Sequence, residues 1–267
     1  MASKTRHPIC ITSPLRRSGT TLLQRLLCSS PDALIYGESC ANDFNLLANL
    51  FSNKEMLFLQ NKEARNHQLQ EVLNGNVNDW IPDLMPEIDG YIDAYKNMIN
   101  TLAKHYNDYA QGQGRKFWGM KMPEWMPTGL ILLQKILPET KIIYLRRDLE
   151  DCVKSAKKMD MIREPQEIQQ FCHTWKQFTS FADLHLKGDQ VLHVNYEDLI
   201  HTPDQIISTI ETFTGVQGID RKVMEVKVNT YNNDPKLEEM HSYLEPAVLT
   251  AEELAIVAAF SNTSQTV

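Results

Sequence analysis

The sequence has little of what a disulfide framework or a metal site needs. Its cysteines number five, an odd count, and they are scattered without a CxxC pair. Such a set does not suit a network of disulfides, and no cluster of histidines and cysteines has the spacing of metal ligands. We therefore expect free thiols in a reducing compartment and no bound metal.

Long apolar runs and an excess of positive charge are also missing. Residues 1–7 are polar, the apolar stretch after them is broken by Pro14 and Arg16, and no other uncharged run reaches the length of a membrane span. The formal net charge is −7, whereas proteins that bind mainly nucleic acid carry a basic excess. We expect a cytoplasmic protein with no nucleic-acid or membrane partner, in which local cations meet any anionic ligand.

Short β-rich runs alternate with longer helical patterns, which favours a parallel sheet with helices on both faces. A second strand is expected just before Glu38. The other expected strands are residues 8–13, 116–120, 141–145 and 191–195, and the expected helices include residues 20–29, 130–137 and 149–158. Thr202, Pro203 and Gln205 predict a capped helix start, and Gly215 predicts the end of that helix.

Residues 41–112 differ from this alternation, because strand signals there are weak and helical patterns are long. We predict a helical insertion over the sheet, placed to cover a bound substrate and to contribute to specificity. Residues 1–267 are expected to form a single domain.

The first strand and the first helix meet in a turn at residues 13–21, SPLRRSGTT. A helix N-terminus presents free N–H groups and a partial positive charge, so this turn can bind an anion. Gly19 permits close approach of the backbone, Thr20 and Thr21 add hydroxyl donors, and Arg17 adds a fork of donors suited to phosphate or sulfate oxygens. The spacing is that of the P-loop GxxxxGK[ST], with Pro14 for the first Gly and Thr20 for the Lys.

At these residues the chain resembles the sulfotransferases that use 3′-phosphoadenosine 5′-phosphosulfate (PAPS), whose phosphosulfate loop reads much like Arg17-Ser-Gly-Thr-Thr21. The family's second motif binds the 3′-phosphate with an Arg next to Asp and a Ser eight positions on, here Arg147 and Ser155 in LRRDLEDCVKS. Arg147 follows strand 141–145, where α/β sheets bind ligands, and Ser155 lies two turns down the next helix, able to face the same crevice.

The resemblance spans residues 8–215 and implies a three-layer, P-loop-like α/β fold with a mainly parallel sheet. It implies PAPS as donor, adenosine 3′,5′-bisphosphate (PAP) as product and no metal. Tyr196, in YEDL, matches a Tyr that helps to hold the nucleotide. Arg16 and Leu149 stand where the family has Pro, and the late Arg-Lys-Gly segment of cytosolic sulfotransferases is missing, with Lys227 as a candidate substitute. The implied donor-binding residues are Arg16, Arg17, Ser18, Gly19, Thr20, Thr21, Arg147, Ser155, Tyr196 and Lys227.

Sulfuryl transfer needs a base for the acceptor and cations for the charge that develops on the leaving phosphate. Glu38 matches by position the catalytic Glu of tyrosylprotein sulfotransferases and is the candidate base, with His173 in reserve because cytosolic enzymes use a His. Lys121 matches a Lys near the sulfonate, where it and Arg17 stabilise the developing charge.

We therefore predict a sulfotransferase that acts on a hydroxyl or amine of a small-molecule acceptor. A tyrosylprotein-like Glu38 does not imply a protein acceptor, because those enzymes are anchored in Golgi membranes. Two alternatives stay open. A P-loop kinase using Mg-ATP would need the missing loop Lys and a Walker-B carboxylate, and none is convincing here. The other is a non-catalytic nucleotide-binding or scaffold protein.

Overall fold

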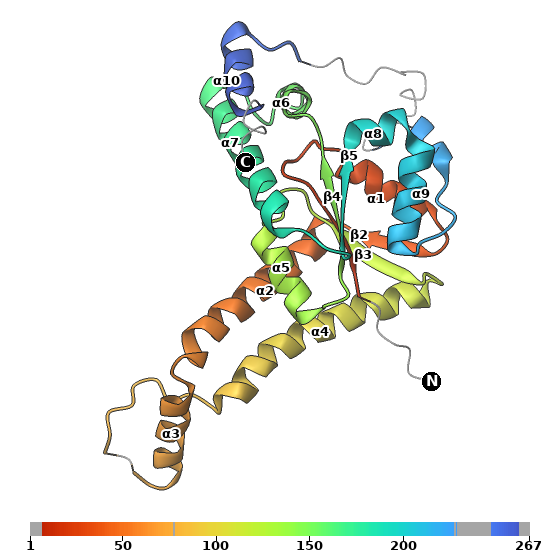
Figure 1. The fold of residues 1–267 in the computed structure, drawn as a ribbon. Coiled ribbons are helices and arrows are strands. Elements are labelled where there is room, and N and C mark those ends of the chain that lie inside the picture. Colours follow the sequence, from red (N-terminus) through yellow and green to blue (C-terminus); the bar gives the residue numbers. More distant parts are fainter. Residues whose placement is uncertain (1–6, 77, 227, 229–246, 262–267) are drawn as a thin grey trace.

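The strands of the protein form one parallel sheet. The computed structural model describes residues 7–76, 78–226, 228 and 247–261. Within them, five strands lie side by side in the order β2-β3-β1-β4-β5, and every pairing is parallel (Figure 1). They are β1 (Ile9–Thr12), β2 (Ala33–Tyr36), β3 (Phe117–Lys121), β4 (Lys141–Arg146) and β5 (Val191–Asn195). The predicted strands are thus confirmed, and their carboxyl ends share one edge, where α/β sheets bind ligands.

Helices cover both faces of this sheet, which confirms the predicted three-layer α/β fold. Successive side chains of a strand point to opposite faces, so Ile9 and Ile11 of β1 pack in one cluster while Cys10 packs in the other. The first face is covered by α1 (Thr20–Ser29), α8 (Tyr196–His201) and α9 (Pro203–Thr214). The second is covered by α5 (Pro127–Ile136) and by the near parts of α2 (Glu38–Leu59) and α4 (Ile88–Gly112).

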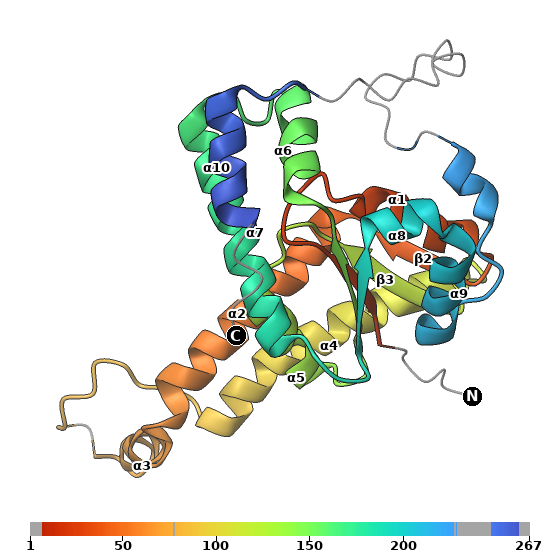
Figure 2. The ribbon, with the colours of Figure 1, turned by 45° about the horizontal axis from the view of Figure 1, so that its top comes forward.

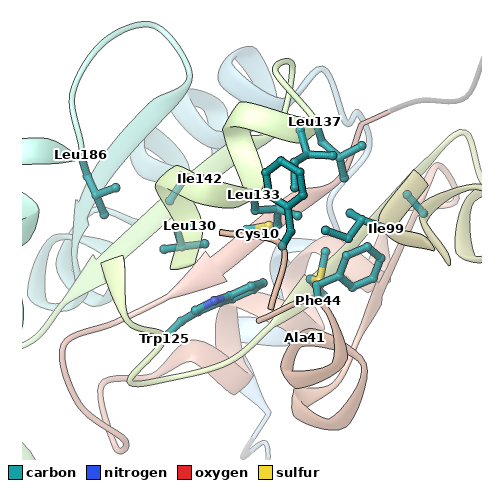
Figure 3. Packing of buried hydrophobic residues seen from close by; sticks show 14 of the residues in the cluster. Cys10, Ala41, Phe44, Ile99, Trp125, Leu130, Leu133, Leu137, Ile142 and Leu186 are labelled. Atoms are coloured by element: carbon teal, nitrogen blue, oxygen red, sulfur yellow. The ribbon is translucent and has the colours of Figure 1, made fainter. Parts of the chain in front are cut away.

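The core on the second face is rich in aromatic side chains. Phe44 and Trp118 are both essentially buried, and their ring centroids lie 5.9 Å apart. Figure 3 shows Phe44, Trp125 and Leu133 meeting in this cluster. This packing anchors the start of α2, and with it Glu38, the first residue of that helix.

The segment predicted as a helical insertion consists of α2, α3 (Lys62–Leu73) and α4. The near halves of α2 and α4 cover the sheet, and the far halves extend beyond it with α3 at the tip (Figures 1 and 2). The helical character is as predicted. Its role in covering an acceptor site stays a prediction.

The predicted cap of α9 is wrong in its chemistry. The helix begins at Pro203 and ends before Gly215, whose φ of 81° is left-handed, both as predicted. The Thr202 hydroxyl, however, donates to the carbonyl of Asp198 at 2.9 Å, and the Thr202 side chain does not cap α9. Because α8 ends immediately before Thr202, a last-turn carbonyl lies within reach and takes the hydroxyl instead.

A C-terminal helix, α10 (Ala251–Ser261), packs along α7 (Pro165–His185) and α6 (Leu149–Lys158), an arrangement that Figure 2 shows clearly. Its Glu253 is 4% exposed, and Lys157 of α6 donates to Glu253 Oε2 at 2.6 Å. The backbone N–H of Thr250 donates to the same oxygen at 2.7 Å. One carboxylate therefore both joins α10 to α6 and closes the start of α10.

We expect Glu253→Gln to lower the free energy of unfolding by about 1–3 kcal/mol, because the Lys157 ammonium loses its buried partner. The bond from Lys157, followed by that from Thr250 N–H, lowers the pKa of Glu253. A carboxyl whose folded pKa is depressed stabilises the fold above its unfolded pKa and loses that effect as the pH falls through the folded pKa. The difference between variant and wild type in urea unfolding should therefore shrink on acidification.

The control for this variant is Asp108→Asn, which breaks an exposed i,i+4 pair with Lys104 on α4. We expect it to change the unfolding free energy by less than about 0.5 kcal/mol. Equal effects of the two substitutions at neutral pH would contradict the assignment of Glu253 as the link between α10 and α6.

Candidate active site

The turn between β1 and α1 folds back on itself around the carbonyl of Leu15. The hydroxyls of Ser13 and Ser18 donate to that carbonyl at 2.6 and 2.8 Å. Two residues take left-handed backbone angles, Arg17 with φ 71° and Gly19 with φ 91°. No side chain in the described residues caps α1, which begins at Thr20. The first N–H groups of α1 are therefore left for an anion, as the sequence predicts.

Gly19 is required at its position by both conformation and space. A Cβ built on Gly19 would lie 2.4 Å from Cδ2 of Tyr196, which is shorter than any real contact. The aromatic ring of Tyr196, in the YEDL segment, thus rests directly on the phosphate loop. That Tyr196 helps to hold a nucleotide stays a prediction.

We expect Gly19→Ala to lower the free energy of unfolding by roughly 2 kcal/mol, because the left-handed backbone is strained with a Cβ and the Tyr196 ring must move. We also expect it to abolish binding of PAP, since the loop and Tyr196 shift together. Thermal melting and calorimetric titration measure the two effects. In Gly112→Ala, where nothing lies within 4 Å of the added Cβ, both quantities should stay near wild type; a similar loss there would contradict the steric argument.

Arg147 connects the loop to the second predicted motif. It follows β4, its Nη1 donates to the carbonyl of Arg17 at 2.9 Å, and its guanidinium carbon lies 4.6 Å from the Tyr196 ring centroid. Arg17 Nε in turn donates to the hydroxyl of Ser155 on α6 at 3.1 Å. Four residues from three separate segments therefore form one contiguous, positively charged group at the carboxyl edge of the sheet.

Lys121 and Glu38 meet at the same edge, beside the start of α1. Lys121 ends β3 and is 6% exposed, whereas the Glu38 side chain, which follows β2, is 57% exposed. Lys121 Nζ donates to Glu38 Oε1 at 2.5 Å and to Thr21 Oγ1 at 3.4 Å. Because β2 and β3 are neighbouring parallel strands, their ends bring a buried cation and an accessible carboxylate together next to the phosphate loop.

Arg16 is directed elsewhere. Its backbone N–H and Nε both donate to Glu124 Oε1, at 3.1 and 2.9 Å, and its Nη2 donates to Glu124 Oε2 at 3.0 Å. The hydrogen bond to Glu124 raises the pKa of Arg16 further above its ordinary value. The sequence analysis missed Glu124, although the replacement of a family Pro by Arg16 signalled that a partner was needed.

The remaining predicted positions lie apart from this group or outside the described residues. His173 is exposed on α7, and its ring lies edge-on to Phe260 of α10, at 6.3 Å between centroids. Leu149, in place of the family Pro, is the buried first residue of α6. Lys227 lies outside the residues that the structure describes.

The described residues contain neither a candidate metal cluster nor a helix that could span a membrane. In residues 7–76, 78–226, 228 and 247–261, no three His, Cys, Asp or Glu side chains are grouped so that they could hold a metal ion. Within the same ranges, no helix combines the length and apolar character needed to cross a membrane. That the reaction uses no metal stays a prediction.

Comparison with known proteins identifies the family of the chain. The model of the sulfotransferase family matches residues 8–220. The structure is similar to the sulfotransferase domain from the curacin biosynthetic pathway, with TM-score 0.49 and 17% identity over 97% of this chain and 99% of that one. It is also similar to the sulfotransferase domain of the Synechococcus PCC 7002 olefin synthase, with TM-score 0.46 and 19% identity over 98% and 97% of the two chains.

A sulfotransferase from Alicyclobacillus acidocaldarius is similar with TM-score 0.45 and 17% identity, over 95% of each chain. No curated protein matches the sequence. Because the family model covers most of its length, the chain belongs to the sulfotransferase family. It is accordingly an enzyme that transfers sulfuryl groups, which decides against the kinase alternative.

Proposed function

We propose that this sulfotransferase takes its sulfuryl group from PAPS and passes it to a hydroxyl or amine of a small-molecule acceptor. The observation that carries the proposal is the continuous contact from Ser155 through Arg17 to Arg147 and Tyr196, next to the Lys121–Glu38 pair. It combines cations for two phosphate positions with a carboxylate that is open to solvent. We further propose that the enzyme is cytoplasmic, which its free cysteines support. Residues 1–267 are proposed to form one domain.

The donor proposal divides the cationic group in two. The N-terminal N–H groups of α1 and the side chains of Arg17, Thr20 and Thr21 would hold the 5′-phosphosulfate, because they surround the start of that helix. Arg147 and Ser155 would hold the 3′-phosphate, with Tyr196 beside them. Arg16 is not retained as a donor-binding residue, because its backbone N–H and two of its guanidinium nitrogens already donate to Glu124.

Glu38 is proposed as the base. In the reaction the acceptor oxygen or nitrogen forms a bond to sulfur, the bond from sulfur to the bridging phosphate oxygen breaks, and the acceptor proton passes to Glu38. Lys121 holds the carboxylate at 2.5 Å before transfer. As Glu38 takes up the proton, Lys121 loses its charged partner and, together with Arg17, stabilises the charge that moves to the leaving phosphate.

The test is transfer of radiolabelled sulfonate from PAPS to 2-naphthol in the presence of EDTA. We expect labelled naphthyl sulfate and PAP to form in equal amounts without added metal. Release of PAP in step with free sulfate, with no labelled ester, would argue against an acceptor hydroxyl. Absence of both products, with PAP failing to bind, would overturn the donor assignment.

A further inference from the structure

A hollow of about 410 Å³ lies beside the phosphate loop, on the side toward α7. Pockets of this volume suit small organic ligands. The residues that line it are Leu15, Arg16, Glu124, Met161, Ile162, Gln166, Glu167, Gln170, Phe171 and Thr174. They come from the loop itself, the segment after β3, the connection from α6 to α7, and the first half of α7.

The hollow adjoins the proposed transfer site. Arg16 on its wall precedes Arg17 in the chain, and Glu124 follows Lys121 by three residues. The carboxylate of Glu38 contributes, after Glu124, to raising the pKa of Arg16, so its charge acts at this wall. A molecule seated in the hollow therefore lies against the phosphate loop, next to the residues that precede Arg17 and follow Lys121.

Every charged side chain that lines the hollow is already paired within the protein. Arg16 and Glu124 form a two-pronged ion pair at 2.9 and 3.0 Å. The Glu167 carboxylate accepts from the backbone N–H groups of Arg163 and Glu164, at 2.6 and 3.1 Å. What the wall offers besides these is apolar surface and neutral amide and hydroxyl groups.

We propose that this hollow is the acceptor site and that it selects an uncharged, mainly apolar acceptor, with the Arg16–Glu124 pair as the residues that set this preference. No described residue of 41–112 lines the hollow, so this site replaces the predicted one beneath that segment. A charged acceptor that moves from water into the hollow would find no unpaired group of opposite charge on the wall. Burying an unpaired charge is strongly unfavourable. The inference rests on the proposed function for its meaning, but the binding preference can be measured without the donor.

The test is titration of three probes that share one aromatic body: 2-naphthol, 6-hydroxy-2-naphthoate and 6-(aminomethyl)-2-naphthol. We expect wild type to bind 2-naphthol at least about tenfold more tightly than either charged probe. Glu124→Gln frees the Arg16 guanidinium and should shift the ratio of affinities toward the naphthoate by about tenfold or more. Arg16→Gln frees the Glu124 carboxylate and should shift it toward the ammonium probe.

The matched control is Glu55→Gln, which breaks a pair with Lys135 of nearly equal exposure on α2 and α5, 55% and 24% against 52% and 25% for Arg16 and Glu124. It should leave all three affinities unchanged. Equal binding of neutral and charged probes, no binding of any probe, or an unchanged ratio in both pocket variants would overturn the inference. Titration with PAP separates the acceptor site from the proposed function. If PAP binds but the probes show no preference, the acceptor site alone is contradicted. If the probes show the expected preference but PAP does not bind, the donor assignment alone is contradicted.

Discussion

Glu38→Gln is expected to slow sulfuryl transfer by a factor of roughly 10²–10⁴, the usual contribution of a positioned general base. The amide keeps the shape of the carboxylate and can still accept a hydrogen bond from Lys121, but it cannot take up the acceptor proton. The Glu38 side chain is 57% exposed, but its partner Lys121 is nearly buried and loses a charged acceptor. We therefore expect the free energy of unfolding to fall by about 1–3 kcal/mol, which thermal melting of the free variant measures separately from the rate. Initial rates with PAPS and 2-naphthol, together with the Kd of PAP by calorimetry, check the two halves of this expectation.

His173→Gln is the control, because His173 was the reserve base and lies against Phe260 of α10. It should retain wild-type rates within about twofold. If Glu38→Gln kept more than a tenth of the activity, or if His173→Gln abolished it, Glu38 would not be the base.

Arg147→Ala is expected to weaken PAP binding by about two to three orders of magnitude, as does loss of one partner of a desolvated charge pair. The substitution removes the proposed 3′-phosphate ligand, the bond to the Arg17 carbonyl and the contact with the Tyr196 ring. The loop thus loses a support as well as a charge. Calorimetric titration with PAP measures the loss, and melting of the free protein shows whether the fold persists.

The adjacent residue, Arg146, supplies a control of the same charge. Arg146 ends β4 and forms an ion pair with Asp183 of α7, away from the loop. We expect Arg146→Ala to change the Kd of PAP by less than about threefold. Equal losses in the two variants would mean that general positive charge, not the contact of Arg147 with Arg17, determines affinity.

The sequence predicted that Arg17, Arg147 and Ser155 lie at one edge of the sheet, because their motifs are local; that they bind the donor stays a prediction. A strand, a turn and a helix in succession fix where Arg17 and Gly19 stand, and the next strand and helix do the same for Arg147 and Ser155. The carboxyl ends of parallel strands lie at one edge of the sheet. Arg17 and Ser155 therefore come into contact although 138 residues separate them in the sequence. The meeting of Lys121 with Glu38 follows from the same geometry.

The missed features depend on contacts that no local pattern encodes. Glu124 finds Arg16 because its backbone, at φ 57°, turns toward the loop, an angle that its sequence neighbours do not signal. Helix α10 carries little contrast between its faces, and the ion pair of Glu253 with Lys157 joins it to α6. The Thr202 hydroxyl was assigned to the wrong partner because two helices compete for it.

The most direct test of the account is thermal melting with PAP, compared with adenosine 5′-monophosphate and with ATP in the presence and absence of magnesium. PAP at about 100 times its Kd should stabilise the protein by roughly 2.7 kcal/mol. We expect a clear rise in Tm with PAP that needs no metal, a much smaller rise with the monophosphate, and loss of the PAP effect in Arg147→Ala. A rise in Tm with magnesium-ATP alone would contradict the assignment of PAPS as donor.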